Sequence, residues 1–347
     1  MNQISSKYIC FTKPLSVTVR EELVEKPLSG ELLCKARKSL ISIGTELHCL
    51  KGKFQEGTNW FDWVKYPFRP GYSMVSEIID KGSDTNGFEI GDFIATYDFH
   101  QQYFKINLNQ TKRNDIPTGL GVYKMDVGLP IEFGTFRSLA CTAQNAFRRS
   151  NYQLGESVAV VGLGLLGQLL LQYCSIAGAS PIVAIDPSEK RTSIAAKANH
   201  VFCISKKIES SVQQAIESND GNGFDIVFDA TGSAECLSPS TELLRRFGRL
   251  VLIGDTPTPQ LQSLGPKIVY NSLSISGIHG YAVPEYSNEF TPWNIQKMSD
   301  LFYKYVLNKK MFLNDLITSS ISVDESAQKY LDLVNNRTDD VGVIVDW

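Results

Sequence analysis

The chain has 347 residues, of which 43% are hydrophobic and 20% are charged. It contains 34 Lys and Arg against 37 Asp and Glu, which gives a formal net charge of −3 at pH 7. This is an ordinary globular composition, and at roughly 100–200 residues per domain it predicts two domains. A weakly negative chain without a long basic run excludes the electrostatic footprint of nucleic-acid binding. The sequence has no apolar run of about 18 residues and no signal-peptide core, so we expect a cytoplasmic protein without membrane contact.

Seven cysteines and four histidines are scattered along the chain. The number of cysteines is odd, and none of them forms a C-x-x-C or similar pair. This spacing predicts neither a disulfide framework nor a structural zinc lobe. The shortage of closely spaced metal ligands also bears on the chemistry that the protein can perform.

The first 100 residues are rich in strand patterns. Strands are expected at 32–41, 74–79 and 92–97, because these runs are apolar or alternating and are separated by Gly and Pro. The segments 51–66 and 108–120 lack a clear period and are expected to be loops.

The pattern changes near residue 150. Short apolar runs at 157–161 and 181–185 predict buried parallel strands. Between them, 165–177 has helical spacing and stops at Gly178, a favourable C-terminal cap. Regular alternation of strands and helices predicts a doubly wound parallel sheet. Further strands are expected at 225–229, 249–253 and 273–277.

The last part of the chain returns to mixed α and β patterns. Thr291-Pro292 is expected to open a helix, with a cap residue followed by proline. Ser322 to Glu325 has the spacing of a capping box and predicts a second helix. The apolar run 341–345 predicts a closing strand.

A glycine-rich loop follows the strand at 157–161. Gly162-Leu163-Gly164-Leu165-Leu166-Gly167 has the spacing G-x-G-x-x-G and opens a predicted helix. In this context Gly162 permits the tight turn, Gly164 lets a pyrophosphate approach the backbone, and Gly167 lets the helix pack on the strand. The helix N-terminus offers unpaired N–H groups to the phosphates. We therefore predict a dinucleotide site formed by the three glycines with Leu165 and Leu166.

Asp186 ends the next predicted strand. A carboxylate at this position accepts both hydroxyls of the adenosine ribose and repels a 2′-phosphate, so NAD is favoured over NADP. Arg191 is also a candidate, since it either binds the ribose or offsets the charge of Asp186. Both residues are predicted to belong to the cofactor site.

Three further residues follow strands of the predicted sheet. Thr231 and Gly254 lie in turns at carboxyl ends of strands, where ligands bind in open α/β sheets. Each either contacts the cofactor or only packs the turn. His279 follows the strand at 273–277, near the expected nicotinamide position, and is either a contact residue or part of a linker.

Several motifs recur together in one superfamily: Ile43–His48, Pro70–Val75, Gly91-Asp92, Gly162–Gly167 with Asp186, and Gly342–Asp346. Together they resemble the medium-chain dehydrogenase/reductase superfamily, in particular its zinc-type alcohol and polyol dehydrogenases, over nearly the whole chain. The resemblance implies an α/β protein in which a GroES-like, β-rich catalytic domain is interrupted by an inserted Rossmann domain. The implied limits are 1–148 and 283–347 for the catalytic domain and 149–282 for the Rossmann NAD-binding domain.

The sequence departs from this family at the zinc ligands. The zinc-type members have Cys at the position of Ile43, His at the position of Tyr72, and an acidic or cysteine ligand where Arg137 fits best. Their four-cysteine lobe falls within 90–125, where this sequence has no cysteine. Isoleucine cannot bind zinc, tyrosine is a poor ligand at neutral pH, and arginine is repelled by a dication. The resemblance therefore implies a member without either zinc site, similar to the bacteriochlorophyllide-type dehydrogenases.

Without zinc, hydrogen-bond donors must stabilise the alkoxide, and a relay must carry the hydroxyl proton. The resemblance assigns this relay to Thr45 and His48, with a structural threonine and a surface histidine as the alternative. Tyr72 is either a donor in the same pocket or a packing residue that fills the metal position. As a further hypothesis, Glu46 and Arg137 form an ion pair beside that position.

The sequence thus predicts a zinc-independent, NAD-dependent oxidoreductase acting on a secondary alcohol or ketone, such as a polyol, cyclitol, sugar or specialised metabolite. One alternative is an NADPH-dependent quinone or enoyl reductase, against which Asp186 and the Thr45/His48 pair argue. The other is an NAD-binding protein whose catalytic half has lapsed. The resemblance implies a homodimer or homotetramer, in which the edge strand around 274–278 pairs across a two-fold axis. An exposed apolar edge strand is a physical reason for such pairing.

Overall fold

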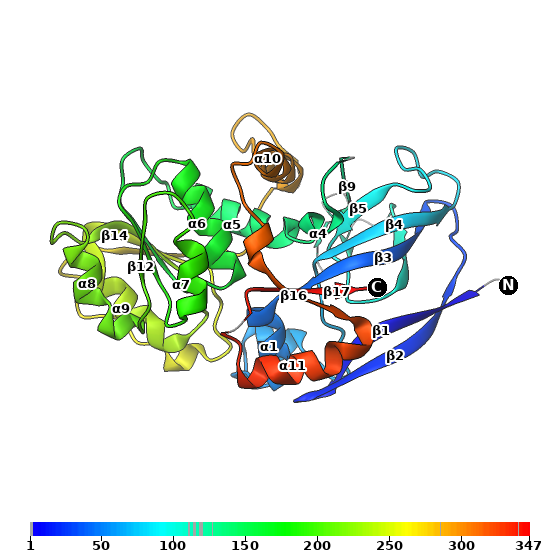
Figure 1. Cartoon of the computed structure of the whole chain (residues 1–347), viewed down its shortest axis with the longest axis horizontal. Helices are drawn as coiled ribbons and strands as arrows, with labels where there is room; N and C mark the ends of the chain where they lie inside the picture. The colour runs from blue at the N-terminus through cyan, green and yellow to red at the C-terminus, as the bar shows by residue number, and fades with distance from the viewer. Residues whose placement is uncertain are drawn as a thin grey trace.

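Two large β-sheets, one parallel and one mixed, lie at opposite ends of the molecule (Figure 1). The computed structural model describes residues 3–109, 112–113, 116–117, 121–126, 128–284, 286–338 and 340–347. None of the helices in these ranges is long and apolar enough to cross a membrane. Much of the loop expected at 108–120 lies outside the described residues; the described part includes an antiparallel pair of short strands, β7 (Lys112–Arg113) and β8 (Ile116–Pro117).

The six-stranded sheet is parallel throughout, in the order β12-β11-β10-β13-β14-β15. The strand order reverses between β10 and β13, and ligands bind at such a reversal in doubly wound sheets. The predicted doubly wound sheet is therefore confirmed, although β12 was missed. The strands are β10 (Val158–Val161), β11 (Ile182–Ile185), β12 (Val201–Ile204), β13 (Phe224–Asp229), β14 (Leu244–Leu252) and β15 (Ser274–Gly277).

Helices cover both faces of this sheet. Alternate residues of β10 enter two separate apolar clusters: Val158 and Val160 pack with Leu169 of α6, whereas Ala159 and Val161 pack with Leu237 of α9. This is the pattern of a strand that is buried on both sides. The helices and turns here are α5 (Arg137–Arg149), α6 (Leu165–Ile176), α7 (Glu189–Ala195), η1 (Ile208–Ser210), α8 (Val212–Glu217), η2 (Ala234–Cys236), α9 (Leu237–Glu242) and η3 (Pro259–Leu261).

The mixed sheet has the order β16-β17-β3-β4-β5-β9, and β6 also pairs with β3. Because β17 pairs antiparallel with β3, the end of the chain returns to the sheet formed by its beginning. This arrangement confirms the predicted fold class, a β-rich part interrupted by a Rossmann part. The strands are β3 (Glu31–Ile41), β4 (Met74–Lys81), β5 (Phe93–Thr96), β6 (Tyr103–Asn107), β9 (Tyr123–Lys124), β16 (Ile317–Ser322) and β17 (Gly342–Asp346).

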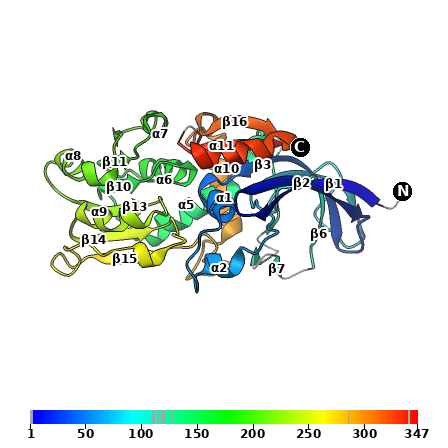
Figure 2. The same cartoon turned by 90° about the horizontal axis from the view of Figure 1, so that it is seen from below.

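The β-rich part differs from the prediction in three places. A long antiparallel hairpin of β1 (Gln3–Lys13) and β2 (Ser16–Glu25) was not predicted; Figure 2 shows it along the edge of the mixed sheet. Helix α1 (Ile43–Lys51) was also missed. The expected loop 51–66 contains α2 (Asn59–Trp63), which Thr58 caps through its side chain.

The C-terminal helices were predicted with one error. The helix expected at Thr291-Pro292 begins later, as α10 (Ile295–Leu307), because the Asn294 side chain accepts from Lys297 N at 3.0 Å and caps it there. The capping box at Ser322 is confirmed. The remaining elements are α4 (Ile131–Gly134), η4 (Asn314–Leu316), η5 (Val323–Glu325) and α11 (Ser326–Asn335).

Strand β15 is the edge of the parallel sheet, and all four of its residues are exposed. An exposed edge is the feature from which association was expected. Pairing of two chains along it stays a prediction.

Candidate active site

The glycine-rich loop connects β10 to α6 with the three expected geometries. Gly162 has φ +87°, and a Cβ added to it would lie 2.8 Å from the Thr231 methyl group. A Cβ on Gly167 would lie 1.9 Å from the Gly162 carbonyl oxygen, so this glycine permits the close packing of helix and strand. A Cβ on Gly164, in contrast, would meet nothing within 4 Å. The open space above Gly164 fits a pyrophosphate held by the N-terminus of α6.

Asp186, directly after β11, is only 4% exposed and lies beside this loop. One carboxylate oxygen accepts from Leu163 N at 2.8 Å, and the other accepts from Ser188 N at 2.9 Å. The two backbone donors fix the carboxylate at the end of the strand, where an adenosine ribose is expected.

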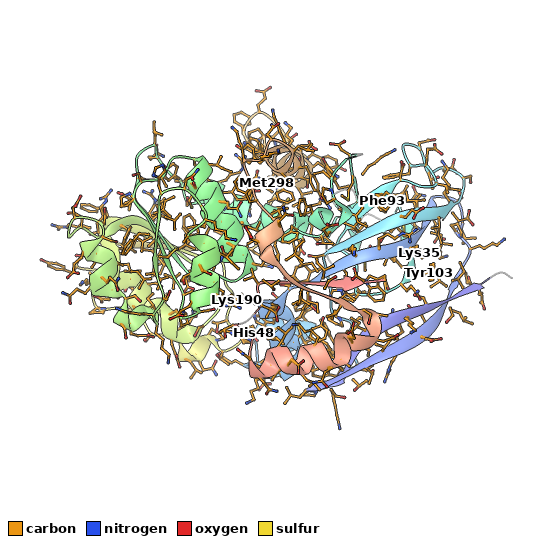
Figure 3. The ribbon with its side chains drawn as sticks, in the orientation of Figure 1. Lys35, His48, Phe93, Tyr103, Lys190 and Met298 are labelled. Carbon is orange, nitrogen blue, oxygen red and sulfur yellow. The ribbon has the colours of Figure 1, made fainter. Side chains whose placement is uncertain are left out.

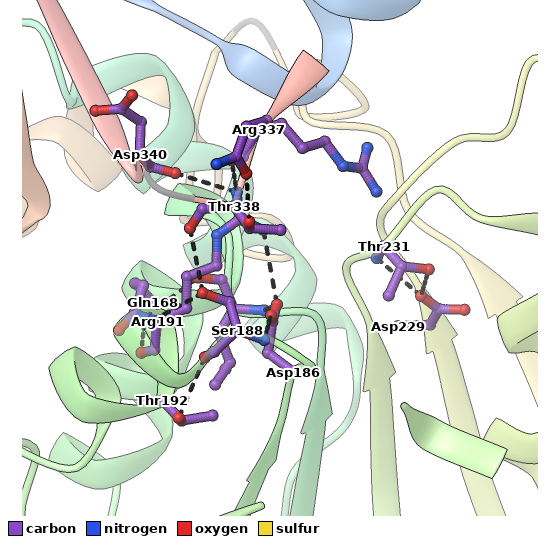
Figure 4. A network of polar contacts seen from close by, with 12 residues as sticks. Gln168, Asp186, Ser188, Arg191, Thr192, Asp229, Thr231, Arg337, Thr338 and Asp340 are labelled. Atoms are coloured by element: carbon purple, nitrogen blue, oxygen red, sulfur yellow. Dashed lines mark hydrogen bonds and ion pairs between the residues drawn. The ribbon is translucent and has the colours of Figure 1, made fainter. Parts of the chain in front are cut away.

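Arg191 lies against Asp186 and also reaches the β-rich part of the chain (Figure 4). Its guanidinium is 3.7 Å from the Asp186 carboxylate and donates to the Arg337 carbonyl at 2.6 Å and the Asp340 carbonyl at 3.1 Å. Burial lowers the pKa of Arg191, although Asp186 opposes this effect. The sequence left two roles for Arg191, which were to bind the ribose or to offset the charge of Asp186. The structure adds that Arg191 connects the two halves of the molecule.

Thr231 and Gly254 pack the turns on the other side of the loop. The backbone N–H and the hydroxyl of Thr231 both donate to Asp229, at 2.8 and 2.6 Å. A Cβ on Gly254 would lie 2.2 Å from Gly232 N. The structure therefore gives both residues a packing role, which was one of the two alternatives, and their contact with a cofactor stays a prediction.

Helix α1 carries the candidate relay. Its first turn brings Thr45 to the hydroxyl of Tyr72, which donates to Ser42 Oγ and lies 3.3 Å from Thr45 Oγ1. Burial raises the pKa of Tyr72 to about 12. Tyr72 therefore stays protonated at neutral pH and is a hydrogen-bond donor within a cluster of three hydroxyl groups.

His48 lies one turn further along α1, on the same face as Thr45, where the two halves of the molecule meet (Figure 3). Its ring contacts Trp60 edge to face, with centroids 5.5 Å apart. Burial lowers the pKa of His48 to about 4, with further contributions from the charges of Arg337 and Lys51. His48 is therefore neutral near pH 7.

Glu46 does not pair with Arg137, so that hypothesis was wrong. Its carboxylate instead accepts from the Tyr330 hydroxyl and lies 3.1 Å from His100 Nε2, while its other oxygen accepts from Ser42 N at 2.7 Å. This buried network holds the start of α1. Sequence reasoning missed it because no pattern connects residues so far apart in the chain.

Arg137, at the start of α5, is almost fully buried. It donates to Ser299 Oγ at 2.8 Å and to the Ala95 carbonyl at 3.3 Å. Its guanidinium carbon lies 5.1 Å from the ring centroid of Tyr97 and 5.3 Å from that of Tyr123. These contacts give Arg137 an aromatic environment that suits a delocalised cation.

The residues at the positions of the family's catalytic zinc ligands do not fit a metal. Ile43 is buried in an apolar cluster, Tyr72 donates to Ser42, and Arg137 is a cation. In the described part of the chain, no group of three or more His, Cys, Asp or Glu residues is arranged to hold a metal ion.

His279 is exposed on the segment after β15. Its ring contacts Tyr281 with centroids 5.4 Å apart, and Tyr281 in turn contacts Tyr97 at 5.3 Å. The Asn145 side chain of α5 donates to the His279 carbonyl at 3.1 Å. This segment therefore connects the carboxyl end of the parallel sheet to the region around Arg137.

Comparisons with known proteins agree with this geometry. Residues 166–299 match the family model described as zinc-binding dehydrogenase. A D-guloside 3-dehydrogenase of Shigella flexneri is 25% identical over 273 residues, which cover 78% of this chain and 75% of the relative. An L-threonine 3-dehydrogenase of Pyrococcus furiosus is 26% identical over 287 residues, which cover 75% and 79%. The chain is an oxidoreductase of the alcohol-dehydrogenase-like type.

A solved structure shares the complete fold. It comes from Sinorhizobium meliloti 1021, is described as a zinc-binding dehydrogenase bound to NADP, and superposes with a TM-score of 0.77. The two chains are 18% identical, and the match covers 99% of this chain and 100% of the other. This likeness shows that the two chains share one fold over nearly their whole length, including the parts that the family model does not match.

Proposed function

We propose that this oxidoreductase is zinc-independent and transfers a hydride between NAD(H) and a secondary alcohol or ketone, such as a polyol, cyclitol or sugar. The observation that carries the proposal is the cluster of Ser42, Thr45 and Tyr72 hydroxyls beside a neutral His48. Hydroxyl donors take the place of a metal at the position where the family polarises its substrate. The names of the two relatives, dehydrogenases of a guloside and of threonine, support an alcohol substrate.

The residues of the chain have separate tasks in this reaction. The bound nicotinamide supplies the acceptor for the hydride that leaves the alcohol carbon. Thr45 Oγ1 accepts the hydroxyl proton of the substrate and passes its own proton toward His48. His48 is neutral, so one ring nitrogen can accept this proton while the other releases its own toward solvent. In the reverse direction, the same groups return the proton to the oxygen of the ketone.

Metal analysis together with a screen of alcohols and polyols tests this proposal. We expect the purified protein to reduce NAD with at least one member of the screen and to contain less than stoichiometric zinc. Treatment with 1,10-phenanthroline should leave the rate unchanged, because no protein group at the site needs a metal. Stoichiometric zinc, or a rate lost to the chelator and restored by zinc, would contradict the metal-free mechanism.

The choice of NAD rests on Asp186, because a carboxylate next to the ribose repels a 2′-phosphate. In Asp186→Ser this repulsion disappears, and the guanidinium of Arg191, 3.7 Å from the carboxylate in the native chain, attracts the phosphate instead. We expect the ratio of NADP to NAD affinity to rise by about tenfold or more, which corresponds to about 1.4 kcal/mol. Titration of both cofactors measures it. Asp186→Glu is the control and should retain the preference for NAD; a native chain that prefers NADP would contradict the assignment.

A further inference from the structure

Tyr97 carries a buried polar group that the proposed reaction does not use. It directly follows β5 and is 5% exposed. In the part of the chain that the structure describes, its hydroxyl has no hydrogen-bond partner. A buried hydroxyl without a partner is unfavourable, because it has lost its hydration without a replacement. Such a group in a native protein calls for an explanation.

The strand register places Tyr97 beside the segment of chain that carries Tyr72. β4 and β5 pair antiparallel with Met74 opposite Thr96. Tyr72 lies just before β4 and Tyr97 just after β5, so the two tyrosines leave the sheet at the same end. Continued by one pair, this register sets Tyr97 opposite Ser73, the residue next to Tyr72. Adjacent strands lie roughly 4.8 Å apart in a regular sheet. The position of Tyr97 is therefore set by the sheet and not by a mobile loop.

The ring contacts of Tyr97 point to the ligand side of the molecule. Its ring meets Tyr281 edge to face, with centroids 5.3 Å apart, and Tyr281 is only partly buried. Tyr281 belongs to the segment after β15, at the carboxyl end of the parallel sheet, where ligands bind. Burial raises the pKa of Tyr281, and Tyr97 and Tyr72 add to this effect, so each of these two tyrosines lies within electrostatic reach of Tyr281.

Tyr97 and Tyr72 approach this region from different sides. The Tyr72 hydroxyl contacts the hydroxyl groups of Ser42 and Thr45, next to and within α1. In the proposed reaction, these hydroxyl groups bind the substrate oxygen that reacts. Tyr97 is held on the α5 side, where the Arg137 guanidinium lies over its ring. Burial raises the pKa of Tyr97 well above its ordinary value, so its phenol keeps its proton and acts as a donor.

We propose that the Tyr97 hydroxyl donates a hydrogen bond to a second oxygen of the substrate, on the carbon next to the one that reacts. This inference rests on the proposed function and narrows its substrate class. The preferred substrates are vicinal diols, polyols and the corresponding hydroxyketones, in which two oxygens are held by two separate donors. A simple secondary alcohol leaves the Tyr97 hydroxyl without its partner.

Tyr97→Phe tests the inference with a pair of substrates. The probes are 2,3-butanediol and 2-butanol, or the best polyol of the screen and its analogue without the neighbouring hydroxyl. For the diol or polyol, kcat/KM should fall by about tenfold, the typical effect of one lost hydrogen bond. For the analogue it should stay within about twofold, because that substrate never used the bond.

Two further measurements separate this role from a structural one. The unfolding temperature of Tyr97→Phe should stay the same or rise, since the substitution removes a buried hydroxyl without a partner. Tyr123→Phe is the matched control: its ring also lies beside Arg137, at 5.3 Å, but its hydroxyl donates to Asp300 at 2.8 Å. It should leave the selectivity between the two probes unchanged.

Three results would overturn the inference: no loss with either probe, an equal loss with both, or a screen in which monoalcohols outrank every diol and polyol. Failure of the proposed function has a different signature. It would be seen in the native protein, as stoichiometric zinc or as the absence of hydride transfer to any member of the screen, whatever the properties of the Tyr97 variant.

Discussion

Alanine in place of Thr45 should lower kcat by roughly 100- to 10,000-fold, the range for loss of a group that transfers a proton. Thr45 Oγ1 lies 3.3 Å from the Tyr72 hydroxyl, on the face of α1 that also carries His48. Without it, the substrate hydroxyl has no side-chain route to the histidine. Steady-state kinetics with NAD and the best alcohol of the screen measure the effect, and cofactor affinity should be unchanged.

The control is Thr45→Ser, which keeps the hydroxyl and should retain activity within about tenfold of the native enzyme. Thr45 is half-buried near the start of α1, so the alanine variant should also keep the native unfolding temperature within a few degrees. Unchanged kcat in the alanine variant would mean that Thr45 has only a structural role in α1 and that the proposed proton relay does not exist.

The second large effect is expected at the glycine-rich loop. In Gly164→Ala, the new methyl group enters the open space where the pyrophosphate should lie. Gly164 has φ −63° and ψ −179°, an extended conformation that alanine adopts without strain. We therefore expect an unchanged unfolding temperature and a loss of NAD affinity of about 100-fold, or about 2.7 kcal/mol. Calorimetric titration with NAD measures the affinity.

Gly167→Ala provides the contrast. A Cβ on Gly167 would lie 1.9 Å from the Gly162 carbonyl, so the helix must move away from the strand. This variant should lose stability in the absence of cofactor, visible as a lower unfolding temperature. If Gly164→Ala bound NAD as tightly as the native chain, the pyrophosphate would not lie above Gly164.

The Rossmann part was predictable because its information is local. Strand, glycine loop, helix and acidic strand end follow one another in the sequence, and each has its own pattern. Helix α1 was missed for the opposite reason. Ile43, Gly44 and Thr45 show no helical preference, and the helix begins where it does because Glu46 accepts the N–H of Ser42 and is held by distant partners.

The same limit applies to the candidate site. The resemblance to zinc-type dehydrogenases identified Thr45, His48 and Tyr72 as a group, and the structure brings Thr45 and Tyr72 together. The resemblance did not reveal the true partners of Glu46, which are His100 and Tyr330. Side chains that pair across the fold produce no periodic pattern in the sequence. The hydroxyl of Tyr97 was overlooked too, since only three-dimensional packing shows that it is buried without a partner among the described residues.

Hydrogen bonds connect the two halves of the molecule at two separate places. Arg191 and Ser188 donate to carbonyl groups of the segment before β17, namely those of Arg337, Thr338 and Asp340. At the second place, Gln55 N donates to the Pro257 carbonyl at 2.9 Å. A rotation that separates the halves has to break these bonds. If the halves have to separate for the cofactor to leave, residues far from the transferred hydride help to set the rate of turnover.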